Sequence, residues 1–311
     1  MDNRQGGAWS RQANERARTM ASMALRAYQA SGLEYLDLAT ALLQGARRAE
    51  PTGGVWEAAD LQWWWRRDQH PDPLDQTFWL RGDTPVAAAI FTDWGDRWGC
   101  DMIGEEHDLS RILPLIWPSV LGRIDSRRDK PVEMIVRDND FPLIDAVGRA
   151  GFEATDKADV TTWMLAAERP GLPQLPEGFE LVTRSDGETR PHHMIARNGE
   201  LVAERLAECS LYRPELDLAV HAPDGGVAAY GLFWADTVTG VGLVEPMRTE
   251  DGYQRMGLAR GVLAEGLDRL ARAGCARFKV SYLVGNEASR RLYLGAGFRP
   301  ESSARTYCRT P

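Results

Sequence analysis

The sequence has little cysteine, little histidine, no excess of basic residues and no long apolar run. Its four cysteines lie far apart in the chain: Cys100, Cys209, Cys275 and Cys308. None has the spacing of a zinc or redox motif, so we expect reduced and mostly buried thiols. The five histidines form no HExxH pattern, and the His192-His193 pair has no partner at metal-ligand spacing. The sequence therefore predicts no metal.

Two further absences narrow the function class. No apolar run approaches the roughly 20 residues that span a membrane, and the first residues contain no apolar signal-peptide core. We therefore expect a cytoplasmic protein without membrane contact. The formal net charge of −8, from 37 basic and 45 acidic residues, argues against nucleic-acid binding. An excess of acidic residues mildly favours a cationic small substrate, but solubility is the default explanation for it.

The chain shows signs of an internal duplication. Its 311 residues suit two domains better than one, and the proline- and glycine-rich segment 168–178 is typical of a linker. The segments "RDNDFPLIDAVGRAGFEA" and "LVGNEASRRLYLGAGFRP" each predict a helix followed by an Ala-Gly-Phe turn and a strand. Aligning the two turns places Asp140 against Asn286 and Val147 against Tyr293.

Hydrophobic patterns predict the secondary structure of the second copy. We expect strands at 179–185, 216–222, 226–236, 239–247, 277–284 and 298–308. We expect helical structure within 188–208 and 286–295, and a helix whose apolar face includes Leu258, Val262 and Leu270. The first copy has a similar order and follows a segment, about 10–67, that we expect to be helical.

The stretch "YQRMGLARGVLAEGLDRL", residues 253–270, leads from a loop of small residues into an amphipathic helix. The first N–H groups of a helix lack partners and carry partial positive charge, so they can bind a phosphate. Gly257 permits close approach, Ala259 leaves the first turn open, and Arg255 can add a charge-assisted contact. By itself, this loop is equally compatible with an ordinary strand-to-helix connection.

A second motif downstream favours the phosphate-binding interpretation. The pattern Gln-x-x-Gly-x-Ala, followed by "NEASRRLYLGAGF", resembles the GNAT family of acetyl-CoA-dependent N-acetyltransferases. The matching residues are Gln254, Gly257, Ala259, Asn286, Tyr293, Gly297 and Phe298. The resemblance covers about 179–309, and the first half resembles a degenerate copy of the same fold. It implies an α+β tandem GNAT protein with two domains, each a mixed, mostly antiparallel twisted sheet flanked by helices.

The resemblance also implies domain boundaries and a binding mode for the cofactor. The expected units are a polar, helical extension at 1–30, a degenerate domain at 31–167, the linker at 168–178 and a catalytic domain at 179–311. Acetyl-CoA would lie between the strand ending near Met247 and the strand 277–284, with its thioester carbonyl on an N–H near Met247. The implied cofactor-binding residues are Met247, Arg248, Thr249, Gln254, Arg255, Met256, Gly257, Leu258, Ala259 and Asn286.

Two residues are the candidate catalytic groups. The resemblance gives Tyr293 the role of the acid that protonates the leaving thiolate, while a packed helix tyrosine is the alternative. Glu245 could act as the base, directly or through water, although a strand-end carboxylate is often merely solvated or paired. Asn286 would orient the pantetheine arm or the helix of Tyr293, and the alternative, which can hold at the same time, is a plain helix N-cap.

The first copy lacks the features of this site. Glu105, Glu106 and Asp108 in its equivalent loop would repel a pyrophosphate, and Val147 replaces Tyr293. We therefore expect no CoA binding there, and a role in covering the other half and forming a wall of the acceptor pocket.

The sequence thus predicts an acetyl-CoA-dependent N-acetyltransferase that acts on a small-molecule primary amine by direct transfer at one C-terminal site. The alternatives are a non-catalytic acyl-CoA-binding sensor and a protein-lysine acetyltransferase. Acetyl-CoA is the expected acyl donor and a monomer or homodimer the expected assembly, with no nucleic-acid partner.

Overall fold

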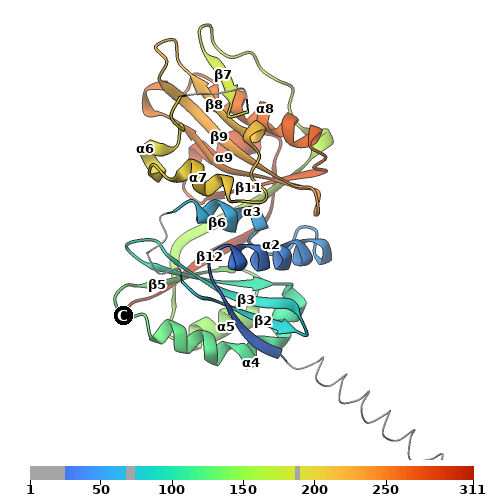
Figure 1. Cartoon of the computed structure of the whole chain (residues 1–311), viewed down its shortest axis with the longest axis vertical. Coiled ribbons are helices and arrows are strands. Elements are labelled where there is room, and N and C mark those ends of the chain that lie inside the picture. The colour runs from blue at the N-terminus through green and yellow to red at the C-terminus, as the bar shows by residue number, and fades with distance from the viewer. Residues whose placement is uncertain (1–24, 68–73, 186–189) are drawn as a thin grey trace, which may run out of the picture.

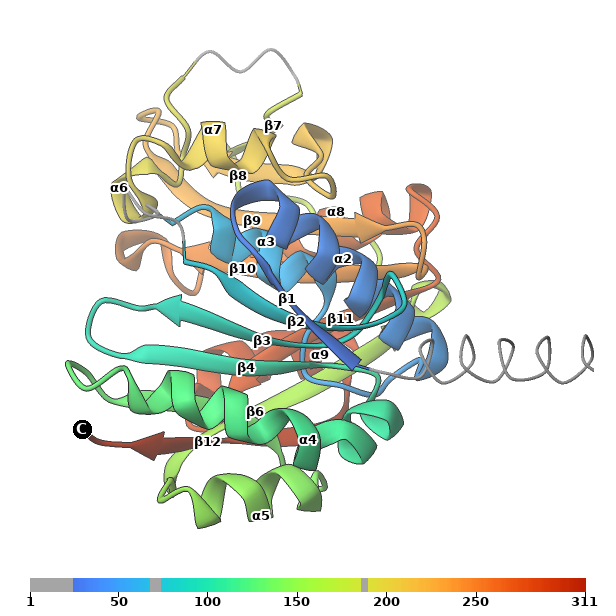
Figure 2. The same cartoon turned by 60° about the horizontal axis from the view of Figure 1, so that its bottom comes forward.

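All strands of the described chain belong to one twelve-stranded, mixed sheet. The computed structural model describes residues 25–67, 74–185 and 190–311. The strand order is β1-β2-β3-β4-β5-β12-β6-β11-β10-β9-β8-β7, and Figures 1 and 2 show helices against the twisted sheet. Only the pairs β4–β5 and β10–β11 are parallel among the described strands. The predicted fold class, a mostly antiparallel sheet flanked by helices, is confirmed.

The two halves of the chain have the same order of elements, β-α-α-β-β-β-α-β-α-β. The N-terminal half contains β1 (Leu25–Ala30), α2 (Gly32–Ala49), α3 (Ala58–Trp65), β2 (Gln76–Arg81), β3 (Thr84–Asp93), β4 (Trp98–Gly104), α4 (Glu106–Asp125), β5 (Val132–Arg137), α5 (Phe141–Arg149) and β6 (Glu153–Leu165). The C-terminal half contains β7 (Glu180–Thr183), α6 (Ile195–Asn198), α7 (Val202–Ala207), β8 (Asp217–His221), β9 (Val227–Asp236), β10 (Val241–Thr249), α8 (Leu258–Arg272), β11 (Arg277–Leu283), α9 (Glu287–Ala296) and β12 (Arg299–Arg309). None of the described helices is both long and apolar enough to cross a membrane.

The predicted helical segment at about 10–67 is partly wrong. Its first residues, up to 24, lie outside the described chain. Residues 25–30 form the edge strand β1, which pairs antiparallel with β2. Leucine, arginine and alanine in "LRAYQA" favour a helix locally, but pairing with a neighbouring strand overrides such preferences.

The last strand of each half lies in the sheet of the other half. β6 pairs with β11, with Thr162 opposite Val280, and β12 pairs with β5, with Thr306 opposite Ile135. β6 and β12 also pair with each other. This exchange joins what would be two sheets into one. The described stretch 169–179 between the halves contains no helix or strand, and the predicted domain boundaries stay a prediction.

Buried side chains form three clusters. One lies between the sheet and α4 with α5, and another between the sheet and α8 with α9. The third is shared by both halves, since it joins α2, α3 and α7 to strands that include β2 and β9. Leu61 of α3 and Trp234 of β9 are both almost completely buried in it. In Figure 1, α3 accordingly lies between the two halves. This packing brings a helix of the N-terminal half against β9 and β10.

Candidate active site

The strands β10 and β11 separate after a short parallel contact. They pair only over Val241–Leu243 of β10. Further along, the pairing of β10 with β9 shifts register between Val244 and Met247. The indole N–H of Trp234 donates to the backbone carbonyl of Glu245 at 2.8 Å and so holds the shifted segment. The backbone edge of β10 beyond residue 244 is therefore left without β11 as a neighbour, and an extended ligand can pair with it.

The loop before α8 presents a row of unpaired amides. Gly257 occupies the N-cap position of the 15-residue α8 with φ +83°, and Arg255 also has a positive φ of 62°. A glycine at the N-cap brings no side chain to bond the first amides of the helix. The backbone N–H groups of 255–260 have no hydrogen-bond acceptor among the described residues. A helix start with free amides has the electrostatics that can bind an anion.

A cavity of about 550 Å³ connects these amides to the start of α9. Its lining consists of Met247, Arg248, Thr249, Tyr253, Gln254, Arg255, Gly257, Leu258, Ala259, Arg260, Asn286, Ala288, Ser289, Leu292 and Tyr293. The structure therefore brings together all but two of the residues predicted to bind cofactor or to catalyse. Met256 is 42% exposed beside the cavity, and Glu245 lies under α3, as described below.

Polar groups on β10 and the following loop differ in whether they have partners. Arg248 pairs with Glu250 and Asp251 at 3.2 and 3.5 Å, and Gln254 donates to Asp251 at 3.2 Å. The hydroxyl of Thr249 is buried and has no partner among the described residues. It is therefore the cavity-lining group on β10 that most needs a hydrogen bond from a ligand.

The helix α9 holds Tyr293 in a defined position. Its N-cap Asn286 accepts the backbone N–H of Ser289 at 3.1 Å, so the helix-capping alternative for Asn286 is observed. Gly297, with φ +109°, ends the helix, and the N–H of Phe298 returns to the carbonyl of Tyr293. Burial, and secondly the charge of Glu245, raise the pKa of Tyr293 above its ordinary value of 10. The phenol therefore stays protonated at neutral pH and can donate a hydrogen bond.

Glu245 is surrounded by residues from both halves. The indole N–H of Trp63, on α3, donates to its carboxylate. Burial and the nearby Asp60 and Asp159 raise the pKa of Glu245 to about 7, although Arg66 and the Trp63 hydrogen bond oppose the rise. A carboxyl group with this pKa can accept a proton near neutral pH, as a general base must.

Sequence reasoning missed the role of α3 at this site. The run "WWWRR", residues 63–67, lies at the end of α3 and just beyond it. Trp63 lies at Glu245, and the indole N–H of Trp65 donates to Glu208 of the C-terminal half at 2.7 Å. Trp64 packs edge-on against Trp56 and Trp94 within the N-terminal half. The cluster of aromatic and basic residues was the available signal, but it gave no indication of the partner.

The equivalent place in the N-terminal half is filled by the protein's own side chains. The strands β4 and β5 also separate after a two-residue parallel contact, but the cavity there is only about 60 Å³. The Glu50 carboxylate accepts the backbone N–H of His107 in the first turn of α4 and bonds Glu106. Glu106 is paired in turn with Arg137. Val147, aligned with Tyr293, is completely buried.

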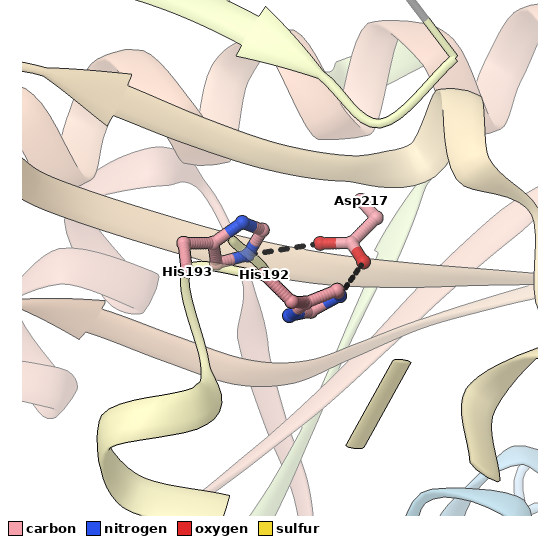
Figure 3. A group of neighbouring side chains, drawn as sticks. All are labelled: His192, His193 and Asp217. Atoms are coloured by element: carbon pink, nitrogen blue, oxygen red, sulfur yellow. Dashed lines mark hydrogen bonds and ion pairs between the residues drawn. The ribbon is translucent and has the colours of Figure 1, made fainter. Parts of the chain in front are cut away.

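Figure 3 shows a second polar cluster, away from this cavity, formed by His192, His193 and Asp217. The Nε2 atom of each histidine lies 3.0 Å from one oxygen of Asp217, and the Tyr212 hydroxyl donates to the same carboxylate at 2.9 Å. Sequence spacing did not reveal this grouping, because Asp217 comes from β8 while the histidines precede α6. The Asp217 carboxylate is fully buried, yet these donors hold its pKa well below the usual range.

The hydrogen bonds of His192 argue against metal binding by this cluster. The Nδ1 atom of His192 accepts the backbone N–H of Met194 at 3.2 Å. In the neutral imidazole, Nε2 must then carry the proton that it donates to Asp217. A metal at Nε2 would require that proton to leave. A histidine that binds a metal through Nε2 also normally donates a hydrogen bond through Nδ1, whereas Nδ1 of His192 accepts one. The geometry favours a structural network that ties the segment before α6 to β8.

A family model matches most of the C-terminal half. Residues 176–298 match the family model described as the acetyltransferase (GNAT) family. No curated protein matches the chain by sequence.

Solved structures share the fold of the whole chain. A tandem GNAT protein from the clavulanic acid biosynthesis pathway is 16% identical, with a TM-score of 0.64 and coverage of 92% of this chain and 98% of that one. A GCN5-related N-acetyltransferase from Sphaerobacter thermophilus is 15% identical, with a TM-score of 0.60 and coverage of 92% and 95%. A GNAT-family acetyltransferase from Colwellia psychrerythraea is 13% identical, with a TM-score of 0.54 and coverage of 92% and 100%. At these identities the likeness shows the fold alone, which is that of a tandem GNAT protein.

Proposed function

We propose that this chain transfers the acetyl group of acetyl-CoA directly to the primary amine of a small molecule. The match of residues 176–298 to the GNAT acetyltransferase family model and the tandem GNAT fold support this proposal. The observation that carries the proposal is the row of amides at 255–260, which lacks acceptors among the described residues and opens on a cavity that extends to Tyr293.

The cofactor would bind in two parts. Its pyrophosphate would accept hydrogen bonds from the free amides around Gly257, where the α8 dipole adds favourable electrostatics. Its pantetheine arm would run along the edge of β10 that β11 leaves open, within reach of the Thr249 hydroxyl. The volume of about 550 Å³ lies within the usual range of small-molecule sites.

The transfer forms a nitrogen–carbon bond and breaks the carbon–sulfur bond of the thioester. Glu245 would accept the proton that the attacking amine loses. Tyr293 would donate to the departing sulfur, and its raised pKa keeps that proton available until negative charge develops. A backbone N–H near Met247 would polarise the thioester carbonyl.

We infer a single active site in the C-terminal half. In the N-terminal half, the Glu50 carboxylate lies at the backbone N–H of His107 in the first turn of α4, and the cavity is about a ninth as large. A pyrophosphate would have to displace Glu50 and approach Glu106, which repels it.

An assay of CoA release from acetyl-CoA across a panel of small amines tests the proposal, with acetyl-CoA binding measured by calorimetry. We expect tight binding of one equivalent and release that depends on the amine. Binding of acetyl-CoA without release for any amine would instead favour a sensor. Release only with lysine-containing peptides would favour a protein-lysine acetyltransferase.

A further inference from the structure

A second cleft, of about 560 Å³, opens where the two halves meet. It is lined by Arg66, Arg67, Asp93, Gly95, Lys130, Arg197, Asn198 and Gly199. These residues come from the end of α3, the turn between β3 and β4, the segment before β5, and the region of α6. The cleft is thus built by both halves, and four of its side chains are cationic against one carboxylate.

The cations of this cleft differ in how they are neutralised. Lys130 bonds Asp93 at 2.8 Å, and Arg197 pairs with Glu250 at 2.8 Å. No carboxylate of the described residues lies within 4.0 Å of the guanidinium of Arg66 or of Arg67. These two arginines therefore leave an unbalanced positive charge at the cleft.

Both guanidinium groups are held in position by neutral contacts. Arg66 lies 3.4 Å above the Trp63 ring, donates through Nε to Asn198 at 2.8 Å, and bonds the Trp63 carbonyl at 2.6 Å. Arg67 lies 4.7 Å above the Trp94 ring. Such contacts order the planar groups in advance, which lowers the entropy cost of binding an anion.

Burial destabilises the charged form of Arg66. Desolvation lowers the pKa of Arg66 to about 10, although Glu245 opposes the fall. A partly desolvated cation gains more from a counter-ion than one in water does. The cleft therefore offers a stronger site for an anionic group than surface arginines would.

The cleft adjoins the candidate base. Arg66 packs on Trp63, and the indole of Trp63 donates to Glu245. A molecule whose anionic group lies at Arg66 and Arg67 can thus extend towards Glu245, from the side of α3 rather than from the cavity beside α8. A second positive charge on the acceptor would instead be repelled by the two arginines.

We propose that the acceptor is an amine that also carries a carboxylate or phosphate, and that Arg66 and Arg67 bind this anionic group. The inference rests on the proposed acetyl transfer and adds the substrate class to it. It departs from the cationic substrate that the acidic composition mildly favoured.

The test compares amines that differ only in the anionic group. One pair is 2-aminoethyl phosphate and ethanolamine, and the other is 4-aminobutyrate and butylamine. We expect kcat/KM to be higher for at least one anionic member by about 10- to 100-fold, as charge-assisted hydrogen bonds provide. The two pairs also distinguish phosphate from carboxylate as the preferred group.

Two variants test whether the preference for anionic amines comes from this cleft. Arg67→Gln should reduce the anionic-to-neutral ratio of kcat/KM by about tenfold or more, whereas Arg149→Gln, an exposed arginine on α5, should leave the ratio unchanged. Equal kcat/KM for both members of each pair in the wild-type enzyme would overturn the inference and leave the proposed function standing. So would a ratio that Arg67→Gln does not change. CoA release with none of the four amines would contradict the proposed function, and the inference with it.

Discussion

Lys279 on β11 and Glu57 at the start of α3 form an ion pair between the two halves, with Nζ and Oε1 2.9 Å apart. Both side chains are almost fully buried, and Arg47 of α2 pairs with the same carboxylate. Lys279 and Arg47 hold the pKa of Glu57 below its usual range although burial pushes it up. The interface of the halves therefore depends on a buried charge network next to the candidate active site.

Glu57→Gln should lower the free energy of unfolding by about 3–5 kcal/mol, because it leaves buried cations without their partner. Urea denaturation measures the change, and Glu287→Gln, an exposed pair member on α9, should shift it by less than about 0.5 kcal/mol. Because the folded pKa of Glu57 is depressed, its contribution should be present above the unfolded pKa and lost as the pH falls below it. Equal effects of the two substitutions would contradict this account.

Gly257→Ala should weaken CoA binding by about tenfold, because an L-residue in the left-handed conformation costs about 1–2 kcal/mol and the free amides would shift. Gly274→Ala is the matched control. Gly274 also has a positive φ and open space around its α-carbon in the described chain, but it follows α8 at the opposite end. Calorimetry should show weaker CoA binding only for Gly257→Ala. The same Kd for both variants would argue against phosphate binding at this loop.

Tyr293→Phe should lower kcat by about 100-fold or more, since the donor to the leaving sulfur is lost. The Kd for acetyl-CoA should stay within about twofold, because the buried ring remains in place. Tyr307→Phe on β12 serves as the control and should retain kcat. Unchanged turnover in Tyr293→Phe would assign this tyrosine to packing alone.

The rate should depend on pH through Glu245. Burial raises its pKa to about 7, so the carboxyl group is protonated and inactive as a base below that pH. We expect kcat/KM to increase with pH through about 7 and then to level off until another group titrates. Glu245→Gln should remove this increase together with most of the activity. A wild-type profile that is flat between pH 5.5 and 8 would exclude Glu245 as the base.

Asp217→Asn should destabilise the C-terminal half by about 1.5–3 kcal/mol per lost charge-assisted bond, since the buried carboxylate accepts several donors. Thermal unfolding monitors the loss. Nitrogen NMR of His192 should show the proton on Nε2, as its bond from Met194 requires. A proton on Nδ1 would disprove this arrangement and reopen metal binding at the cluster.

Sequence patterns predicted most residues that line the cavity beside α8, because the signals for these residues are local. The loop around Gly257 and the helix from Asn286 to Tyr293 each fold within a short stretch, and their residues meet across two neighbouring elements. Asp140 and Asn286 cap equivalent helices by the same bond to the residue three positions on. Aligning the two Ala-Gly-Phe turns had paired these two residues.

The rest of the site depends on contacts between segments that are distant in the sequence, and such contacts cannot be predicted from local patterns in a single sequence. Trp63 and Glu245 come from opposite halves, and only the packing of α3 on β9 and β10 brings them together. The strand β1 was predicted as helix because its residues favour one, while pairing with β2 decided the outcome. The cluster at Asp217 was missed because Asp217 belongs to β8, whereas both histidines lie in the segment before α6.

The placement of β12 between β5 and β6 has a consequence for biosynthesis. A ribosome makes the N-terminal half first, yet β5 cannot gain its final neighbour until residues 299–309 have been translated. Cutting the chain within 168–178 should therefore yield two polypeptides that complement each other when mixed, rather than two modules that can be exchanged freely among proteins.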